Sequence, residues 1–260
     1  SQLYYHQDGH GGPPPFSMMN RWFTRYLHGI ENGVENDARV WIVRENDPHE
    51  KPTPYDAFPN PAASMVRLYL NGNAPGRGSL ALVNTNSRKV ETLEDNYSFD
   101  GASLAQAERT NHRLIYLTPE LKEDIHLSGT PEISIKLSSS KPAANLSVWL
   151  VSLPWNTAKN AKITDNIITR GWADPQNHSS ERKGKPLKPG KFYSMSFPLQ
   201  PDDQIIPKGQ KIALMIFSSD KEFTVWPKPG TEITVDLENT FLKLPVVGGP
   251  KALESSLSQP

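Results

Sequence analysis

The chain has 260 residues, which is long enough to bury a full hydrophobic core, either as one large domain or as one domain with the remnant of a neighbour. Its 28 Lys and Arg residues balance 28 Asp and Glu residues, and no apolar run approaches the roughly 20 residues of a bilayer span, so we expect neither a nucleic acid nor a membrane as a partner. The absence of cysteine excludes disulfides, thiolate nucleophiles and sulfur-ligated metals, and it favours a cytoplasmic location while leaving a secreted or cell-surface location open.

The first residues predict a strand, a loop and a helix. Residues 3–5 predict the strand, and the Gly- and Pro-rich segment 6–15 predicts the loop. Ser17 is the expected N-cap, and Gly29 or Gly33 is expected to end the helix. The helix itself is predicted from bulky residues at helical spacing, namely Met18, Met19, Trp22, Phe23, Tyr26, Leu27 and Ile30. Because such an apolar stripe needs a partner, we expect the helix to dock onto a domain whose other parts lie outside the chain.

Beyond Asn36 the apolar residues alternate. The whole chain has 24 prolines and 17 glycines, which are spread between short apolar runs. Roughly ten strands without intervening helices predict two packed sheets, hence an all-β jelly roll or a related sandwich. The predicted strands are 39–44, 65–70, 79–83, 114–117, 133–137, 146–153, 193–197, 212–217, 223–226, 233–237 and 241–246.

Four segments are predicted to be irregular. The Pro-rich segment 51–61 is expected to cross the surface in an extended conformation. Residues 71–78 look like a phosphate loop, but no helix follows them, so we interpret them as a hairpin loop. Residues 157–191 predict long polar loops around a short apolar centre, and residues 250–260 predict a loose tail unless a partner orders them.

His10 is the candidate catalytic residue. In α/β-hydrolases the triad histidine lies on a loop between the last strands and a closing helix, and residues 1–30 have this layout. A general base needs such a loop, anchored at both ends, to bring its ring within hydrogen-bond distance of the nucleophile. His6 is the alternative, and the flanking glycines favour His10. Taken alone, a histidine in a glycine-rich loop is more often structural than catalytic.

A complete catalytic triad cannot be assembled within this chain on sequence grounds. It has no Gly-x-Ser-x-Gly elbow, and the candidate serines Ser98 and Ser128 follow the histidine instead of preceding it. Asp8 is so close to His10 in sequence that we interpret it as a loop residue. The sequence alone therefore assigns neither the nucleophile nor the acid.

The spacing of His6 and His10 also resembles a metal-binding pair on one helical face. Three glycines and three prolines make a helix unfavourable there, and Gln7 stands where zinc peptidases carry a glutamate. We expect no metal and no cofactor.

Several runs of the sequence, taken together, resemble one known family. The run from His6 to His10, followed by 18–34, resembles the end of the catalytic domain of bacterial X-prolyl dipeptidyl aminopeptidases, which are serine peptidases related to cocaine esterase. The runs 121–131 and 205–214 resemble the C-terminal β domain of that family. The resemblance extends to about Gly249 and implies three parts: 1–36 as the end of an α/β-hydrolase domain, 37–249 as a β-sandwich domain and 250–260 as the tail.

The resemblance implies an enzyme that releases Xaa-Pro dipeptides from peptide N-termini through an acyl-enzyme. His10 matches the catalytic histidine of the family, and the serine and the aspartate would precede residue 1, so we expect the chain alone to be inactive. Its expected partners are the upstream catalytic domain of the same polypeptide and a proline-containing peptide substrate.

The family resemblance also implies a role for the β domain, described there as a non-catalytic jelly roll similar to galactose-binding modules. We expect it to support the catalytic domain. Two alternatives stay open: a carbohydrate- or peptide-binding module that uses Trp155, Trp172 and Trp226, and the tail of a related esterase.

Overall fold

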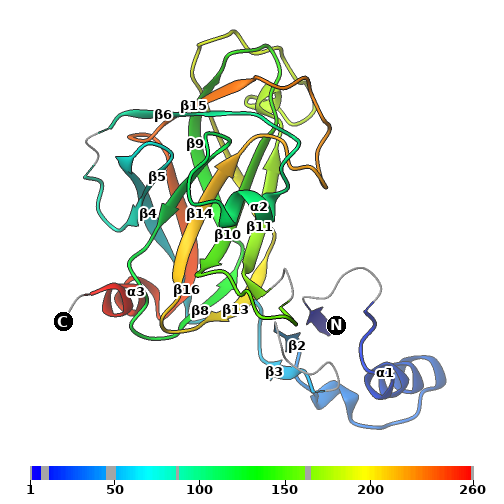
Figure 1. Cartoon of the computed structure of the whole chain (residues 1–260). Coiled ribbons are helices and arrows are strands. Elements are labelled where there is room, and N and C mark those ends of the chain that lie inside the picture. The colour runs from blue at the N-terminus through cyan, green and yellow to red at the C-terminus, as the bar shows by residue number, and fades with distance from the viewer. Residues whose placement is uncertain (1, 7–11, 45–50, 86–87, 162–164, 259–260) are drawn as a thin grey trace. The chain divides into compact units, whose positions relative to one another are not determined.

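The computed structural model describes residues 2–6, 12–44, 51–85, 88–161 and 165–258. The chain divides into two compact units, Ser1–Pro61 and Ala62–Pro260, which we call the N-terminal unit and the sandwich unit (Figure 1). Most of the regular structure in the described residues is β-strand, which confirms the predicted all-β class. The predicted boundary at residues 36 and 37 stays a prediction.

The N-terminal unit contains a three-stranded sheet in the order β1-β2-β3, formed by β1 (Leu3–His6), β2 (Val40–Val43) and β3 (Thr53–Tyr55). Strands β1 and β2 are parallel, whereas β3 is antiparallel to β2. The connection between the two parallel strands carries α1 (Phe16–His28) and the 3-10 helix η1 (Val34–Asn36). This β-α-β order is typical of an α/β fold, because parallel strands need a long crossover.

Helix α1 lies two residues earlier than predicted. Its N-cap is Pro15 instead of Ser17, and the Pro15 carbonyl accepts hydrogen bonds from the amides of Met18 and Met19. A proline keeps its φ near −65° and its carbonyl free, so the helix can begin directly after the proline run. Gly29 ends the helix with a φ of 70°, as predicted, because a left-handed residue there favours glycine.

The sandwich unit has one hydrogen-bonded path of strands in the order β11-β10-β14-β7-β5-β4-β16-β9-β15-β6, with β12 beside β9, β8 beside β16 and β13 beside β8. Among the described pairs of this unit, β5 with β7 is parallel and the others are antiparallel. The strands are β4 (Ala63–Ala74), β5 (Arg77–Ala81), β6 (Val90–Glu94), β7 (Arg113–Leu117), β8 (Ile125–Gly129), β9 (Glu132–Ser139), β10 (Leu146–Leu153), β11 (Ile167–Ala173), β12 (Tyr193–Pro198), β13 (Asp202–Ile206), β14 (Lys211–Phe217), β15 (Glu232–Asp236) and β16 (Phe241–Val247).

The path folds into two facing layers. Residues such as Leu150 and Leu214 from β10 and β14 share one core cluster with Ile133 and Leu242 from β9 and β16, so the two ends of the path face each other across this core. The alternate residues of β10, including Trp149, point to the outer face and form a second cluster under α2 (Gly101–Gln106). Both faces of β10 are therefore covered, as the apolar residues on both of its faces predict.

Several segments differ from the sequence-based expectations. Residues 223–226 form an irregular loop instead of a strand, and α2 and the 3-10 helix η3 (Pro175–Asn177) lie between strands that were expected to follow one another without helices. Strands β6, β8 and β13 were not predicted. The apolar centre of 157–191 is the first part of the longer strand β11. The hairpin predicted at residues 71–78 is confirmed by the pairing of β4 with β5, but its loop is shorter than predicted, because β4 continues to Ala74 and β5 begins at Arg77.

The expected loose tail is an ordered helix, α3 (Gly249–Leu257). Leu253 is fully buried in the main core, and the Ser256 hydroxyl donates a hydrogen bond to the carbonyl of Glu123 over 3.0 Å. One buried leucine and one buried serine, three positions apart, are enough to hold this face of the helix because they lie on the same side of it.

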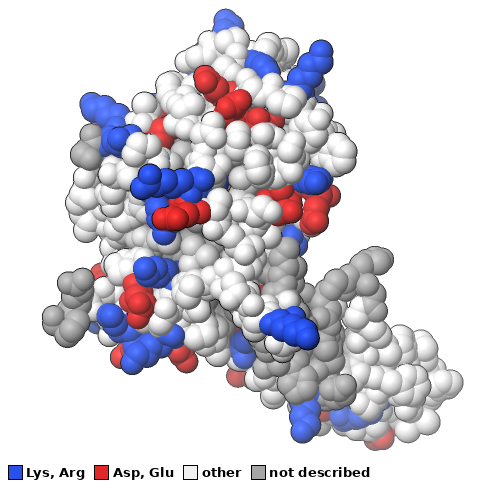
Figure 2. All heavy atoms as spheres, viewed as in Figure 1, with Lys and Arg blue, Asp and Glu red and all other residues white. Residues whose placement is uncertain are grey.

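Basic and acidic side chains alternate over the face shown in Figure 2, as the balanced composition predicts. Within the described residues, no helix has the length and apolar character that a membrane span requires.

Candidate functional site

His10 and Asp8 lie outside the described residues, but both ends of their loop are described. Strand β1 ends at His6, and the chain is described again from Gly12. A Cβ atom placed on Gly12 would lie 2.6 Å from Cε1 of His6, so the backbone at Gly12 lies directly against the His6 imidazole. The two ends of the loop are therefore adjacent, and Gly12 can approach this closely because it has no side chain.

This loop begins at the carboxyl end of two parallel strands, since His6 of β1 is paired with Val43 of β2. In α/β sheets the carboxyl ends of parallel strands are where functional residues gather. The His6 ring packs at the base of the loop, with its centroid 5.6 Å from that of Tyr4. Of the two candidate histidines, His6 thus contributes to the packing of the loop base.

The polar side of α1 is bound to the segment that follows it. Arg21 donates to Oδ2 of Asp37 over 2.7 Å, and Asn32 donates to the backbone carbonyl of Arg21 over 2.7 Å. Arg25 lies 3.2 Å from a carboxylate oxygen of Glu35, whose pKa is lowered by a hydrogen bond from its own amide and by Arg25. Because solvent screens exposed ion pairs, these contacts orient α1 more than they stabilise it.

The apolar side of α1 is uncovered. Among the described residues none of its side chains is buried, and Phe16, Leu27 and the adjoining Ile30 are 78%, 71% and 56% exposed. Phe23 and Tyr26 are about half exposed as well. Contiguous exposed apolar surface of this kind marks an interaction site.

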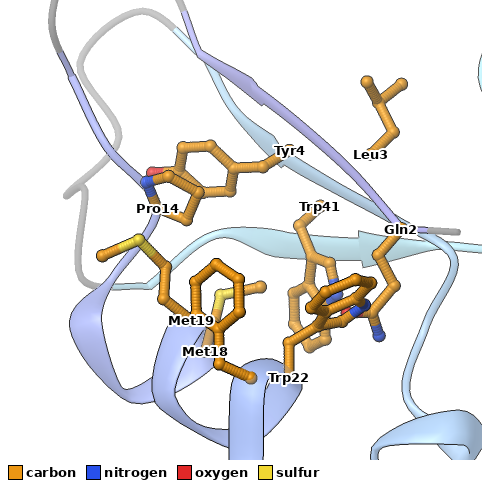
Figure 3. A pocket seen from close by; sticks show the side chains of 9 residues that line it. Gln2, Leu3, Tyr4, Pro14, Met18, Met19, Trp22 and Trp41 are labelled. Atoms are coloured by element: carbon orange, nitrogen blue, oxygen red, sulfur yellow. The ribbon is translucent and has the colours of Figure 1, made fainter. Parts of the chain in front are cut away.

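A cavity of about 170 Å³ lies between α1 and the first two strands. Figure 3 shows Tyr4 and Trp41, from β1 and β2, facing Met18, Met19 and Trp22 of the helix. Part of the helix is therefore packed loosely on its own strands, and the remaining apolar surface faces solvent.

The serines considered as nucleophiles belong to the sandwich unit. Ser128 is fully buried in β8, and Ser98 follows β6 on the surface. Within the described residues, no three His, Asp or Glu side chains lie close enough together to hold a metal ion.

Two of the three tryptophans proposed for ligand binding are engaged internally. Trp155 packs against the second core cluster. The indole N–H of Trp172 donates to Oδ2 of Asp220 over 3.0 Å, and its ring lies 4.9 Å from that of Phe223. Trp226 differs, because 60% of its surface is exposed. Asp220, which also accepts the indole N–H of Trp149, is central to this network, and nothing in its polar sequence context indicated that role.

Solved structures of several hydrolases share this fold. The chain superposes on an α-amino acid ester hydrolase with a TM-score of 0.66 at 16% identity, covering 88% of this chain and 44% of that one. It superposes on a CocE/NonD family hydrolase from Staphylococcus aureus with a TM-score of 0.65 at 15% identity, covering 89% of this chain and 45% of the other. The architecture is therefore one found in large hydrolases, in a region that makes up less than half of each.

Sequence comparison is more specific. Residues 32–255 match the family described as the X-Pro dipeptidyl-peptidase C-terminal non-catalytic domain, and the chain belongs to this family. A provisionally named Xaa-Pro dipeptidyl-peptidase of Rhodopirellula baltica is 62% identical over 98% of this chain and 41% of its own length. A Lacticaseibacillus rhamnosus Xaa-Pro dipeptidyl-peptidase is 26% identical over 88% of this chain and 33% of its own length. The chain thus spans about two fifths, or less, of these relatives.

Proposed function

We propose that this chain is the C-terminal region of a serine-type Xaa-Pro dipeptidyl-peptidase. In this proposal the N-terminal unit completes the catalytic domain, and the sandwich unit supports that domain without contributing to the chemistry. The remainder of the polypeptide, about three fifths of it by the coverage of the Rhodopirellula baltica relative, is called the catalytic portion below.

The uncovered apolar side of α1 carries this proposal. A 13-residue helix without a buried side chain gains little from packing, and isolated helices of that length are marginal in water. The helix does follow a strand and a loop in the order found at the end of an α/β-hydrolase domain. A catalytic portion that covers Phe16, Leu27 and Ile30 would supply the missing contacts.

His10 is proposed as the general base of the triad. It would take the proton of the serine hydroxyl as the oxygen attacks the carbonyl carbon of the proline residue, and then give that proton to the departing amine. Water would attack the acyl-enzyme by the same proton transfers, releasing the dipeptide and restoring the serine. The adjacent loop ends at His6 and Gly12, at the carboxyl end of β1, support a base mounted there.

The test is hydrolysis of a Gly-Pro anilide by the chain alone, by the catalytic portion alone and by the two mixed. We expect activity only in the mixture, and a loss of three orders of magnitude or more with His10→Ala, because removal of a triad member leaves only binding and oxyanion stabilisation. His6→Ala, with the fold checked by circular dichroism, tests the alternative histidine and should lose much less activity than His10→Ala, because His6 packs at the base of the loop. Full activity of His10→Ala would refute the assignment, and activity of the chain alone would refute the division of the site.

The same mixture distinguishes a peptidase from an esterase. A dipeptidyl-peptidase should cleave the Gly-Pro anilide and lose this activity when the amino terminus of that substrate is acetylated. Hydrolysis of a simple aryl ester without cleavage of the Gly-Pro anilide would identify the chain as the C-terminal region of an esterase instead.

A further inference from the structure

The sandwich unit exposes a group of large apolar side chains on one loop. Between β14 and β15, Phe223, Val225 and Trp226 are 49%, 76% and 60% exposed. The ring of Tyr97 stacks on Trp226 from outside this loop, with an interplanar angle of 4°. We call Phe223, Val225 and Trp226 the aromatic patch.

The loop that carries the patch is held in place at both ends. The carboxylate of Asp95 accepts hydrogen bonds from the amide and the hydroxyl of Ser219, at 2.8 and 3.0 Å, and the Asp95 amide donates to the carbonyl of Thr231 over 2.7 Å. In the middle of the loop, the side-chain amide of Asn145 donates to the carbonyl of Val225 over 2.8 Å. The apolar side chains are therefore displayed by an ordered backbone.

The layer beneath the patch keeps Phe223 at the surface. The guanidinium of Arg170 lies over the rings of Phe223, Trp172 and Trp149, at 4.6, 5.7 and 5.4 Å from their centroids. Burial lowers the pKa of Arg170, and the nearby carboxylate of Asp220 opposes this effect. Because a cation and two indoles already occupy the space, Phe223 cannot turn inward, and the surface is preorganised for a partner.

The size of the patch indicates what kind of partner it fits. One half-exposed phenylalanine, one valine and one tryptophan present on the order of 300 Å² of apolar surface. A stable complex of independent proteins buries about 800 Å² on each partner, so the patch is too small to hold a free partner by itself. A partner tethered in the same polypeptide has an effective concentration in the millimolar range and needs less surface.

We propose that the aromatic patch docks onto an apolar surface of the catalytic portion of the same polypeptide. This inference rests on the proposed function, since it requires a catalytic portion. The length of the relatives supports it, because this chain covers only 41% of the Rhodopirellula baltica protein. The patch would then be a second attachment point, in addition to α1.

Oxidative footprinting of side chains tests the proposal directly. Oxidation rates are compared between the 260-residue chain and the full-length polypeptide that includes the catalytic portion. We expect the rates of Phe223 and Trp226 to fall at least fivefold in the full-length polypeptide. Met65, which is 51% exposed outside the patch, is the reference side chain. Unchanged rates at Phe223 and Trp226 would overturn the proposal.

A second experiment measures the affinity of the chain for the separately produced catalytic portion. Val225→Ser should raise the Kd at least tenfold, whereas Val83→Ser, a matched control at 64% exposure, should leave it unchanged. Leu27→Asn in α1 tests the proposed function instead. If Leu27→Asn weakens the binding of the catalytic portion and Val225→Ser does not, the docking of the patch is overturned and the proposed function stands. None of these three variants should shift the melting temperature of the chain by more than about 1 °C, because surface substitutions rarely change stability.

The same experiments can also reveal two other kinds of partner for the patch. If the chain forms dimers at micromolar concentration and Val225→Ser makes it monomeric, the patch is a contact between copies and the proposal is wrong. If a glycan or a proline-rich peptide binds and quenches Trp226 fluorescence in the full-length polypeptide, the patch is a ligand site and the proposal is equally wrong.

Discussion

Gly101, the first residue of α2, lies directly against the indole of Trp149. A Cβ atom at this position would lie 2.7 Å from Cζ3 of the indole, and nearer still to Cη2 and Cζ2. Ordinary contacts between such carbon atoms are close to 3.5–4.0 Å. Gly101→Ala therefore requires the ring or the helix to move by about 1 Å or more.

Neither side can move freely. Trp149 is 2% exposed, donates its indole N–H to Asp220 over 3.0 Å and meets Phe217 edge to face. Helix α2 is capped by the Asp100 carboxylate, which accepts the amide of Ser103 over 2.7 Å, and buried Arg113 donates to the carbonyl of Leu104. Overpacking in such a site costs about 1–3 kcal/mol, and the preference of helices for alanine over glycine returns at most about 1 kcal/mol.

We therefore expect Gly101→Ala to lower the melting temperature of the sandwich unit by roughly 2–8 °C, because 1 kcal/mol corresponds to about 2–4 °C for a unit of this size. Differential scanning calorimetry of the chain measures it. Trp149→Phe removes part of the ring, so the added cost of Gly101→Ala should shrink in the double variant. A melting temperature equal to or above that of the unaltered chain would refute the reasoning, because it would mean that α2 is not confined against Trp149.

Two further substitutions test other parts of the sandwich unit. Burial raises the pKa of Glu91, although the Tyr116 hydroxyl and Arg88 oppose this shift. The protonated carboxyl therefore contributes its full stability below the ordinary pKa of a glutamate. This contribution is lost as the pH rises through the raised pKa. Glu91→Gln should consequently raise the melting temperature more at pH 8 than at pH 4, as measured by thermal denaturation in matched buffers; an equal effect at both pH values would contradict the burial argument. Leu253→Ala should lower the melting temperature by roughly 4–15 °C, because deletion of a buried leucine side chain costs about 2–5 kcal/mol. The exposed Lys251→Ala is its control, and a shift below about 1 °C for Leu253→Ala would mean that α3 is not anchored.

The sequence predicts most of the architecture because the apolar periods are long and regular. The stripe from Met18 to Ile30 and the apolar residues on both faces of β10 each specify one structure, and Gly29 marks the end of α1. The strand predicted at residues 223–226 is wrong because their apolar side chains face solvent. The argument from alternating residues assumes instead that one face of such a segment is buried.

Helix α3 and the hydrogen bonds of Asp220 could not be predicted from the sequence, for a different reason. Helix α3 depends on a hydrogen bond between Ser256 and Glu123, which lie 133 residues apart, and Asp220 gains its role from two indoles on β10 and β11. Contacts of this kind leave no local pattern. His10 stays a prediction, supported by the strand, the loop ends and the helix on either side of it.

Strand β2 lies between β1 and β3, and this has a practical consequence for any shortened version of the protein. The family match begins at residue 32, which would retain β2 and remove β1 together with α1. Such a truncation would turn a central strand into an edge strand, with the buried side chains of Val40 and Ile42 beside unpaired backbone groups. Exposed apolar edges of this kind pair with other chains, so a version cut at residue 32 should aggregate, whereas one cut at residue 62 retains no part of this sheet.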